Sequence, residues 1–556
     1  MSVTAAERWE TGGGNDRLTL RHQSAENGDA LITSNFRRGD AVYLYEYADS
    51  PDARRSILFR AVIDKLLPDS IELRLNNGQR DATLFSGNRH WAVEHSHSDI
   101  STSNNLRSLF EFAQAKKNKR DILLGITAPR ADSSLTLTRS YHHAYDDIVL
   151  RSKQARDFFL LVGPPGTGKT SMAMRFITQE ALASAQAPVL LTAYTNRAVD
   201  EICQMLCDAG IDFLRLGSES SCDERFRDHL ADNVARRLTK LEDLKLYINK
   251  VEVVVATTTM LESRPYIFRV KHFRLAVVDE ASQILEPNII GILTKTDRFV
   301  LIGDYRQLPA VVQQEEPVQT LFERLIRQEQ QARRTLFTGT LCYQGRMHPE
   351  VALFPATMFY HDQQLLPVPL PHQQEPTLGY DTIGGDDTDR MIASHRMLFL
   401  HVTPDRQDSP LPNWAEARLV ADLLRRLQRL MGSRFQTDTS VGVIVPYRSQ
   451  IAAIRHEIDR LAITDMQDVC IDTVERYQGS SRDVIIYSFT ATTPAQMDFI
   501  ASSCFNDGAI TIDRRLNVAL TRARRQVIMT GDSRLLCRNA IFRQLIEQYS
   551  PSKPNS

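Results

Sequence analysis

The stretch Gly163-Pro-Pro-Gly-Thr-Gly-Lys-Thr170 decides the fold of this chain. It directly follows the apolar run Phe158-Phe-Leu-Leu-Val162 and precedes a segment, 171–183, whose pattern predicts a helix. A buried strand, a glycine-rich turn and a helix in this order are the setting of a phosphate-binding loop. Backbone N–H groups of such a loop surround phosphate oxygens, and the N-terminus of the following helix favours negative charge. The sequence therefore predicts a nucleoside triphosphate site in an α/β domain.

Two residues at the end of this stretch have defined roles in such a loop. Lys169 can reach the β and γ phosphates, and the Thr170 hydroxyl can be a ligand of Mg²⁺. A chance glycine-rich turn would rarely combine these residues in register behind a strand. We expect the other contacts to the nucleotide from Gly163, Pro165, Gly166, Thr167 and Gly168.

Composition places the chain among globular intracellular proteins. Its 556 residues predict roughly three or four structural units, and the hydrophobic content of 42% is enough for large cores. The net charge is −1, so any nucleic acid has to be bound by local clefts and not by an overall basic field. Seven scattered cysteines contain no paired motif for zinc or an iron–sulfur cluster, which predicts reduced thiols and a cytoplasmic location. Residues 1–14 lack the apolar core of a signal peptide, and no apolar run is long enough to cross a membrane, so we expect no membrane contact.

Strand and helix patterns alternate over most of the chain and predict two successive α/β domains. Short apolar strands separated by helices indicate parallel sheets flanked by helices over residues 131–330 and 331–547, with a helical insertion at about 220–250. The strands expected in the first domain are 158–162, 189–195, 213–216, 251–257, 275–278 and 299–302. Those expected in the second domain are 398–402, 441–445, 469–473, 484–489 and 527–530.

The remaining segments flank these two domains. Residues 1–34 are polar and predict a flexible leader, and residues 548–556 predict a C-terminal tail. Short alternating strands followed by a helix predict that residues 35–130 form a small β-barrel with a helical stalk. The basic cluster Lys116–Arg120 at the end of this helix either contacts a phosphate backbone or is a solvated helix terminus.

Acidic and amide side chains follow two further strands of the first predicted domain. Asp279 and Glu280 end the apolar strand Val277-Val278, where the first carboxylate can hold Mg²⁺ and the second can orient or deprotonate an attacking water. Gln307 follows the strand at 299–302, and a neutral amide at this edge of the sheet can detect a γ-phosphate. Together with the phosphate-binding loop, these residues predict hydrolysis of the triphosphate.

The second predicted domain contributes arginines. Gln344-Gly-Arg346-Met-His-Pro349 and Leu520-Thr-Arg522-Ala-Arg524 place two of them in short motifs. Phosphoryl transfer builds negative charge on the γ-phosphate, and an arginine from a facing domain stabilises that charge. Hydrolysis would then depend on domain closure, as a motor requires. The alternative is that these arginines form ordinary salt bridges.

As a set, the motifs resemble those of superfamily 1 helicases. More narrowly, they are similar to the group that contains the nonsense-mediated-decay RNA helicase and the replication nuclease-helicase. The similarity covers about residues 135–535. The matching stretches are 163–170 (motif I), 191–202 (Ia), 253–259 (Ic), 279–283 (II), 303–309 (III), 344–349 (IV), 443–450, 472–479 (V) and 515–522 (VI).

This resemblance implies two tandem RecA-like domains with ATP and Mg²⁺ between them, preceded by an accessory barrel with a helical stalk. Thr170 and Asp279 would hold Mg²⁺, and Glu280 would be the catalytic base. Gln307 would sense the γ-phosphate, and Arg346 and Arg522 would be the arginine fingers that complete the catalytic set.

The resemblance also implies a nucleic-acid track. Single-stranded nucleic acid would cross both domains and be moved 5′ to 3′, with DNA slightly favoured over RNA because the chain lacks an added RNA-binding module. The alternative activity is an ATP-driven clamp or protein-displacing remodeller that does not unwind duplexes, and a protein partner or a larger complex stays open. The backbone contacts are expected from Thr195, Asn196, Thr257, Thr258, Tyr447, Arg448 and Thr473.

Three positions depart from the family pattern. Tyr141 stands where the family has the glutamine that reads adenine, Gly345 where it has an aromatic that stacks on the base, and Ser481 where it has a glutamate for the ribose. Every residue expected at the phosphates is present. We therefore expect ATP hydrolysis with relaxed selectivity for adenine, unless Tyr141 or Tyr343 stacks on the base instead.

Overall fold

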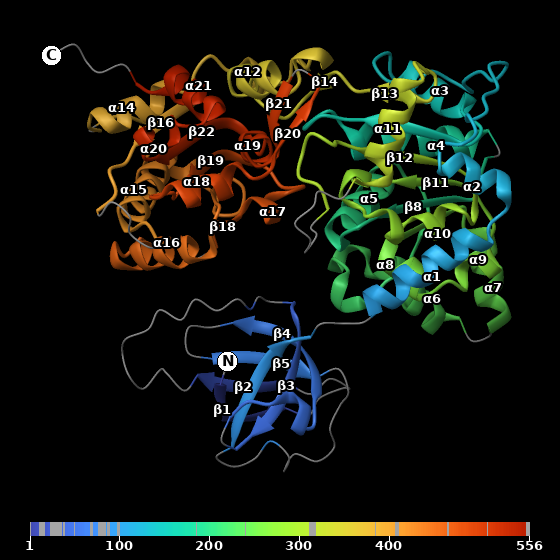
Figure 1. Ribbon diagram of the computed structural model, residues 1–556, viewed down its shortest axis with the longest axis horizontal. Coiled ribbons are helices and arrows are strands. Elements are labelled where there is room, and N and C mark those ends of the chain that lie inside the picture. The colour runs from blue at the N-terminus through green and yellow to red at the C-terminus, as the bar shows by residue number, and fades with distance from the viewer. Residues whose placement is uncertain are drawn as a thin grey trace. The chain divides into compact units, whose positions relative to one another are not determined.

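The computed structural model divides the chain into two compact units, Met1–Ile100 and Ser101–Ser556, which are described separately (Figure 1). It describes residues 2–10, 17–22, 36, 39–48, 50–66, 70–75, 85, 89–96, 100–184, 186–238, 241–310, 319–383, 385–405, 411–463, 466, 468–508 and 510–551.

The N-terminal unit is a closed antiparallel barrel with the strand order β1-β2-β5-β4-β3-β6. In β5, every second side chain is buried, because alternate residues of a strand face opposite sides of the sheet. The inward residues Leu44, Ile63, Leu73 and Val93 are fully buried and form its core with other apolar side chains. The strands are β1 (Ser2–Glu10), β2 (Arg17–His22), β3 (Ala41–Tyr47), β4 (Phe59–Leu66), β5 (Ser70–Leu75) and β6 (His90–His95).

The predicted flexible leader at 1–34 is wrong for two segments. β1 and β2 are strands of the barrel, and β2 buries Leu18 and Leu20 in its core. The polar character of this stretch hid the short alternation of Leu18 and Leu20. The rest of the predicted leader lies outside the described residues.

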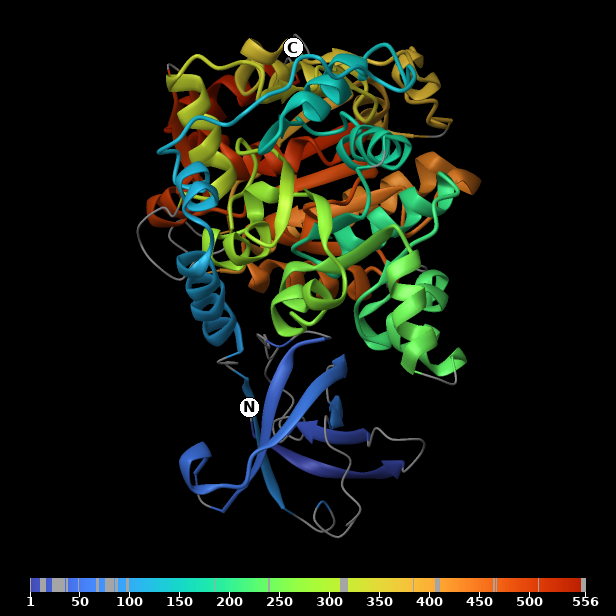
Figure 2. The same ribbon diagram turned by 90° about the vertical axis from the view of Figure 1, so that its right-hand side faces the viewer.

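The helical stalk belongs to the large unit and not to the barrel, which corrects the predicted 35–130 domain. It consists of α1 (Ile100–Gln114) and α2 (Lys117–Leu123), the light-blue helices beside the first α/β domain in Figure 2. The Gly291 N–H donates to Ser108 Oγ of α1 at 2.9 Å, and Lys295 pairs with Glu111 at 2.6 Å. A Cβ atom at Gly291 would lie 2.8 Å from the Ser108 Cα, so only glycine allows this approach.

The basic cluster lies at the junction of α1 and α2, and three of its side chains bond to neighbouring groups at the surface of the large unit. Lys117 pairs with Asp121 at 2.5 Å, and Lys119 Nζ donates to the Asp297 carbonyl at 2.8 Å. Arg120 donates to the Ala113 carbonyl. The cluster therefore forms the start of α2, and a contact to a phosphate backbone stays a prediction.

The first α/β domain has a seven-stranded parallel sheet in the order β13-β7-β12-β11-β8-β10-β9. All six predicted strands form, within a few residues of their predicted ends. The strands are β7 (Phe158–Val162), β8 (Val189–Ala193), β9 (Leu214–Arg215), β10 (Val253–Thr257), β11 (Phe273–Val278), β12 (Thr296–Gly303) and β13 (Thr338–Thr340). The helices are α3 (Asp146–Gln154), α4 (Arg175–Ala183), α5 (Asn196–Asp208), α8 (Thr258–Ser263), α9 (Ile267–Val270), α10 (Ile290–Leu293) and α11 (Leu321–Gln331), with α6 (Ala231–Arg237) and α7 (Leu241–Lys250) in the predicted insertion.

The predicted domain boundary at 330/331 is wrong. β13 adds to the first sheet beside β7, with Thr338 opposite Leu160 and Thr340 opposite Val162. The three residues Thr338-Gly-Thr340 carry no apolar pattern, so the sequence did not indicate a strand there. The first domain therefore extends at least to Thr340.

The second α/β domain has a five-stranded parallel sheet in the order β16-β22-β19-β17-β18. Its strands are β16 (Met397–His401), β17 (Val441–Val445), β18 (Cys470–Thr473), β19 (Arg482–Ser488) and β22 (Ala523–Gly531). Its helices are α12 (Pro349–Met358), α13 (Pro371–Gln374), α14 (Asp387–Ser394), α15 (Trp414–Met431), α16 (Arg448–Arg460), α17 (Val474–Tyr477), α18 (Pro494–Ala501), α19 (Arg514–Leu520), α20 (Ser533–Leu536) and α21 (Ala540–Tyr549). Two small sheets pair β14 (Tyr343–Gln344) with β15 (Leu366–Pro367) and β20 (Cys504–Asp507) with β21 (Ile510–Asp513).

The structure also bears on the predicted C-terminal tail, the cysteines and membrane-spanning helices. α21 continues to Tyr549, so it takes in the first two residues of the predicted tail, and residues 552–556 lie outside the description. All seven cysteines are free thiols. Among the described residues, no helix has both the length and the apolar character that crossing a membrane requires.

Candidate active site

Both α/β domains line one cavity of about 840 Å³. Because the sheets are parallel, the loops after β7, β11 and β12 all emerge at the carboxyl edge of the first sheet, where α/β proteins bind ligands. These loops carry Lys169, Glu280 and Gln307, and the second domain adds Arg346 and Arg522 to the same cavity. The structure therefore brings together the side chains that the sequence placed at the phosphates.

The glycine-rich loop has the backbone conformation of an anion-binding turn. Gly166 and Gly168 have φ angles of +75° and +70°, in the left-handed region that favours glycine. A Cβ atom at Gly163 would lie 2.4 Å from Lys169 Cγ, so the lysine stem occupies the space that a side chain there would need. Lys169 Nζ donates to the Gly163 carbonyl at 2.9 Å and faces the cavity from the loop itself.

A hydroxyl and a carboxylate adjoin at the start of the following helix. Thr170 Oγ1 donates to Asp279 Oδ2 at 2.5 Å, and the Asp279 side chain is buried. Burial and the neighbouring Glu280 raise the pKa of Asp279, which a bound cation would reverse. Hydroxyl and carboxylate oxygens are the ligands that Mg²⁺ takes beside phosphates, so these two residues fit the ion.

Glu280 has an unusual backbone conformation for its residue type. Its φ angle is +49°, which is uncommon for any residue other than glycine. Its N–H donates to Asp279 Oδ1 at 2.9 Å, and its Oε2 accepts from Gln283 Nε2 at 3.1 Å. This conformation directs the side chain into the cavity while Asp279 stays buried beside the loop.

Gln307 and Arg522 connect the two domains at the cavity. Arg522 Nη2 donates to Gln307 Oε1 at 2.7 Å, and Gln307 Nε2 donates to Asp304 Oδ2 at 2.9 Å. Both residues are buried, and burial together with the neighbouring Arg346 lowers the pKa of Arg522 to about 9. An anion beside this guanidinium would stabilise its charged form.

Arg346 reaches the phosphate-binding loop from the second domain. The Gly345 N–H donates to the Gly166 carbonyl at 2.9 Å, and a Cβ atom at Gly166 would lie 2.5 Å from Arg346 Cβ. Burial also lowers the pKa of Arg346. The buried Arg522 guanidinium, the half-buried Arg346 and the Lys169 ammonium around one cavity favour a multiply charged anion such as a triphosphate.

A second set of contacts between the domains lies around Arg306. Its guanidinium is buried and donates to both carboxylate oxygens of Asp362 at 2.5 and 2.7 Å, and to Asp507 at 2.9 Å. Tyr360 OH donates to Asp304 at 2.6 Å. Asp304, which holds Gln307, is thereby connected to the second domain as well.

The sequence and the site together identify the family. Two family models, both described as AAA domains, match residues 137–315 in two overlapping stretches, 137–246 and 224–315, and residues 318–534. The chain belongs to the superfamily 1 helicases. The resemblance drawn from the motifs is thus confirmed.

Several helicases are similar to this chain over most of its length. The DNA replication ATP-dependent helicase/nuclease DNA2 of Xenopus laevis is 30% identical over 94% of this chain and 49% of its own length. JHS1 of Arabidopsis thaliana, which carries the same description, is 30% identical over 79% of this chain and 32% of its own length. An uncharacterized ATP-dependent helicase of Methanocaldococcus jannaschii is 25% identical over 81% of this chain and 77% of its own length. This chain therefore spans a third to a half of the length of the two helicase/nucleases.

Solved structures show a weaker likeness. The crystal structure of arterivirus nonstructural protein 10, a helicase, has 14% sequence identity and covers 97% of this chain and 79% of its own. The TM-score is 0.38, which is too low to compare the two folds in detail.

The residues that the helicase resemblance assigns to nucleic acid lie at the carboxyl edges of neighbouring strands. Thr195 and Thr257 follow or end β8 and β10, and their hydroxyls accept from backbone N–H groups at the start of α5 and α8 at 3.2 Å. Tyr447 follows β17, and its ring stacks on Phe499 at 5.1 Å. Asn196 and Arg448 are exposed.

Two of these residues have buried side chains. Thr258 is fully buried at the start of α8, and Thr473 is 6% exposed at the end of β18. The Thr258 hydroxyl also has no hydrogen-bond partner. The start of α8 turns the Thr258 side chain into the domain, so its hydroxyl does not face the proposed track, and a contact through the Thr258 backbone N–H stays a prediction.

The base side of the cavity differs from the prediction at Tyr141. Its hydroxyl donates to Glu180 at 2.8 Å and its ring packs against Phe176, so it does not line the cavity. Tyr343, Gly345 and Ser481 do line it. His142 and His143 line it too, although nothing in their spacing marked them as binding residues.

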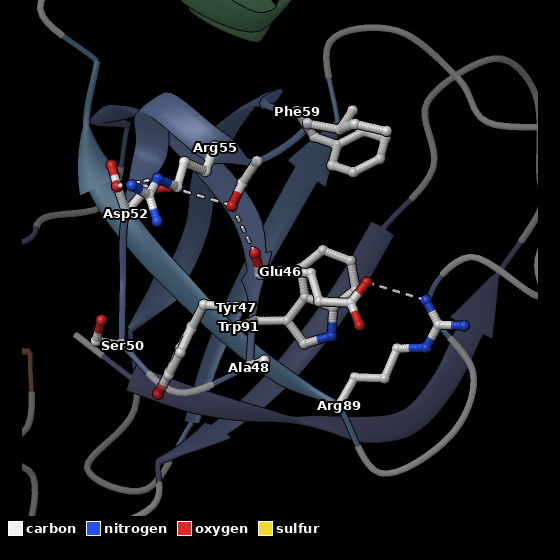
Figure 3. A pocket seen from close by; sticks show the side chains of 11 residues that line it. Glu46, Tyr47, Ala48, Ser50, Asp52, Arg55, Phe59, Arg89 and Trp91 are labelled. Carbon is white, nitrogen blue, oxygen red and sulfur yellow. Dashed lines mark hydrogen bonds and ion pairs between the residues drawn. The ribbon is translucent and has the colours of Figure 1, made fainter.

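The barrel has a separate pocket of about 550 Å³ (Figure 3). Trp91 is buried at its wall, and Glu46 pairs with Arg89 at 3.0 Å across the labelled side chains. Asp52 pairs with Arg55 at 3.5 Å. None of the predicted site residues lies in this pocket.

Proposed function

We propose that this chain is an ATP-dependent helicase, which hydrolyses ATP between its two RecA-like domains to move along single-stranded nucleic acid and separate duplexes. One observation carries the proposal: Lys169 and Glu280 of the first domain and Arg346 and Arg522 of the second line the same cavity. Residues from two domains at one phosphate site make hydrolysis depend on domain closure, as a translocating motor requires.

The residues divide the chemistry between them. Loop N–H groups and Lys169 bind the β and γ phosphates, and Glu280 accepts the proton of the attacking water at a carboxylate oxygen. Arg346 and Arg522 stabilise the negative charge that develops on the γ-phosphate. Mg²⁺, held by Thr170 and Asp279, would neutralise charge on the phosphate oxygens. Gln307 connects this site to the second domain through Arg522.

The track is proposed at the carboxyl edges of both sheets. Thr195, Asn196 and Thr257 lie on the first domain, and Tyr447 and Arg448 lie on the second. Contacts to phosphates and bases on two separately moving domains give sequence-independent stepping. We propose movement 5′ to 3′ from the family resemblance, and DNA over RNA because the helicase/nucleases that match are named for DNA replication. We propose an intracellular location, which is consistent with an ATP-dependent helicase activity.

The first test is the rate of ATP hydrolysis, alone and with saturating single-stranded DNA or RNA, with Lys169→Ala as the blank. We expect DNA to stimulate the wild-type rate strongly and the variant to stay at background. Duplexes with a 5′ or a 3′ single-stranded tail then give the direction. A rate that neither polymer changes would contradict the motor and favour an ATP-driven clamp.

A further inference from the structure

The cavity continues well past the groups that face the phosphates. Its remaining lining combines His142 and His143 of the first domain with Tyr343, Val368 and Leu370 of the second. Tyr343 and Leu370 are 44% and 39% exposed, so both present ring or methyl surface to this space. Flat apolar and imidazole surfaces of this kind are suited to a planar ring.

The histidine pair is held in place against the phosphate-binding loop. The rings of His142 and His143 stack with centroids 4.4 Å apart, and the edge of Tyr145 meets His142 at 5.5 Å. Tyr145 OH donates to the Thr167 carbonyl at 3.0 Å. The pair is thus positioned by the same loop that binds phosphate.

Leu370 occupies the space beside Gly345. A Cβ atom at Gly345 would lie 3.0 Å from Leu370 Cδ1, so a larger side chain at 345 would require the leucine methyl group to move. Leucine thereby supplies the apolar surface that Gly345 cannot.

The segment that carries Leu370 is fixed by backbone bonds. β15 pairs with β14, and the Val368 N–H donates to the Gln344 carbonyl at 2.9 Å. Gln373 Nε2 donates to the same carbonyl at 3.0 Å, and its N–H donates to the Leu370 carbonyl at 2.9 Å. Leu370 is therefore part of a preformed wall and not of a free loop.

Three polar side chains at or near this part of the cavity are bonded to protein partners. Tyr141 bonds to Glu180 outside the cavity. Gln204, which lines the cavity, accepts from Arg225 at 2.7 Å and donates to Asp208 at 2.7 Å. Gln307 is held by Asp304 and Arg522.

We propose that Leu370 and Tyr343 of the second domain, with the His142–His143 pair of the first, form a base subsite that binds purines by stacking and does not read their edges. The inference rests on the proposed nucleotide site and deepens it. Stacking depends on ring area, so ATP and GTP bind alike, and CTP binds more weakly because its base is smaller. Base binding also draws the two domains together, since each provides part of the surface.

The test measures the affinity of wild type and Leu370→Ala for ATP, GTP and inorganic tripolyphosphate. Leu370→Ala should lower the affinity for ATP and for GTP equally, by about 5- to 50-fold, and leave the affinity for tripolyphosphate unchanged. Leu366→Ala is the matched control, because Leu366 is an exposed leucine of β15 that does not line the cavity.

Two results would overturn the inference while leaving the nucleotide site intact. One is unchanged ATP affinity in both Leu370→Ala and Tyr343→Ala, and the other is a preference for ATP over GTP of more than about 100-fold in the wild type, which stacking alone cannot supply. If neither ATP nor tripolyphosphate binds the wild type more tightly than Lys169→Ala, the proposed function itself fails.

Discussion

Arg522 Nη2 of the second domain lies 2.7 Å from Gln307 Oε1 of the first, and both side chains are buried. The arginine is oriented from its own helix side by the bond from its Nε to the Val518 carbonyl at 3.1 Å. Gln307 is oriented by Asp304. Each partner is therefore fixed within its own domain, so the bond between them forms only when the two domains adopt this relative position.

Replacing Arg522 should abolish turnover while sparing nucleotide binding. We expect Arg522→Ala to lower kcat by about 10³- to 10⁵-fold, because the arginine stabilises charge that develops mainly in the transition state. Arg522→Lys should restore little, since an ammonium cannot satisfy Val518 and Gln307 with the geometry of a guanidinium. Single-turnover hydrolysis and ATP affinity give the two readouts, with the exposed Arg543→Ala on α21 as control. A loss below about tenfold would show that Arg522 is a structural residue only.

Removing Arg306 should weaken the association of the two domains. Arg306→Leu leaves Asp362 and Asp507 without their shared partner, which we expect to cost about 1–3 kcal/mol of contact free energy, because both carboxylates are partly exposed to water. In small-angle scattering with a non-hydrolysable ATP analogue, this variant should keep the larger radius of gyration of the nucleotide-free protein. Arg324→Leu is the control, because Arg324 pairs with Glu286 inside the first domain. Compaction equal to that of the wild type would refute this role of Arg306.

The proposed track predicts a measurable change in salt dependence. Arg448 stands exposed at the start of α16, so Arg448→Ala should remove one phosphate contact and reduce the slope of log Kobs against log salt by about 0.7 for single strands. Arg460→Ala, at the opposite end of the same helix, should leave the slope unchanged. Equal slopes for all three proteins would exclude a phosphate contact from Arg448.

The Glu262 side chain, which lies near the stalk, should make the free energy of unfolding depend on pH. Burial and the nearby Glu111 raise the pKa of Glu262 to about 8, whereas an unfolded glutamate titrates near about 4.3. The folded state thus holds the carboxyl proton of Glu262 more tightly than the unfolded state does. The protonated carboxyl group therefore makes its full contribution to the free energy of unfolding below about pH 4.3, and this contribution is lost as the pH rises through 8.

Glu262→Gln should therefore raise the unfolding temperature at pH 8.5 by about 1–3 °C and have no stabilising effect at pH 4. Thermal unfolding at both pH values measures this. Glu242→Gln, on α7 of the same domain, is the control. Stabilisation of equal size at both pH values would mean that the effect comes from packing and not from the proton.

The positions of Lys169, Glu280 and Gln307 at the cavity could be predicted because each lies in a short local motif that follows an apolar strand. Strands such as Phe158–Val162 and Val441–Val445 form over the residues that the sequence indicated. Parallel sheets then place the residues that follow them at one edge, so Lys169, Asp279 and Gln307 had to converge.

Features that depend on contacts far apart in sequence were not predictable. The segment 367–389 is rich in proline and glycine, a composition that does not indicate strand pairing, yet it delivers Leu370 to Gly345 through the pairing of β14 with β15. Thr258 follows Thr257 directly, and only the start of α8 decides that one is accessible and the other buried. Tyr141 turns to Glu180 because Lys153 holds that carboxylate at 2.6 Å inside the domain.

The position of β13 has a practical consequence for dividing the chain. A fragment that ends at residue 330 loses β13 and leaves β7 as the edge of the first sheet. β7 is Phe158-Phe-Leu-Leu-Val162, an uninterrupted apolar strand with no charge or proline to prevent pairing with another copy. Such a fragment should self-associate and precipitate, whereas one that continues through Leu341, whose N–H donates to the Val162 carbonyl at 2.9 Å, keeps that edge covered.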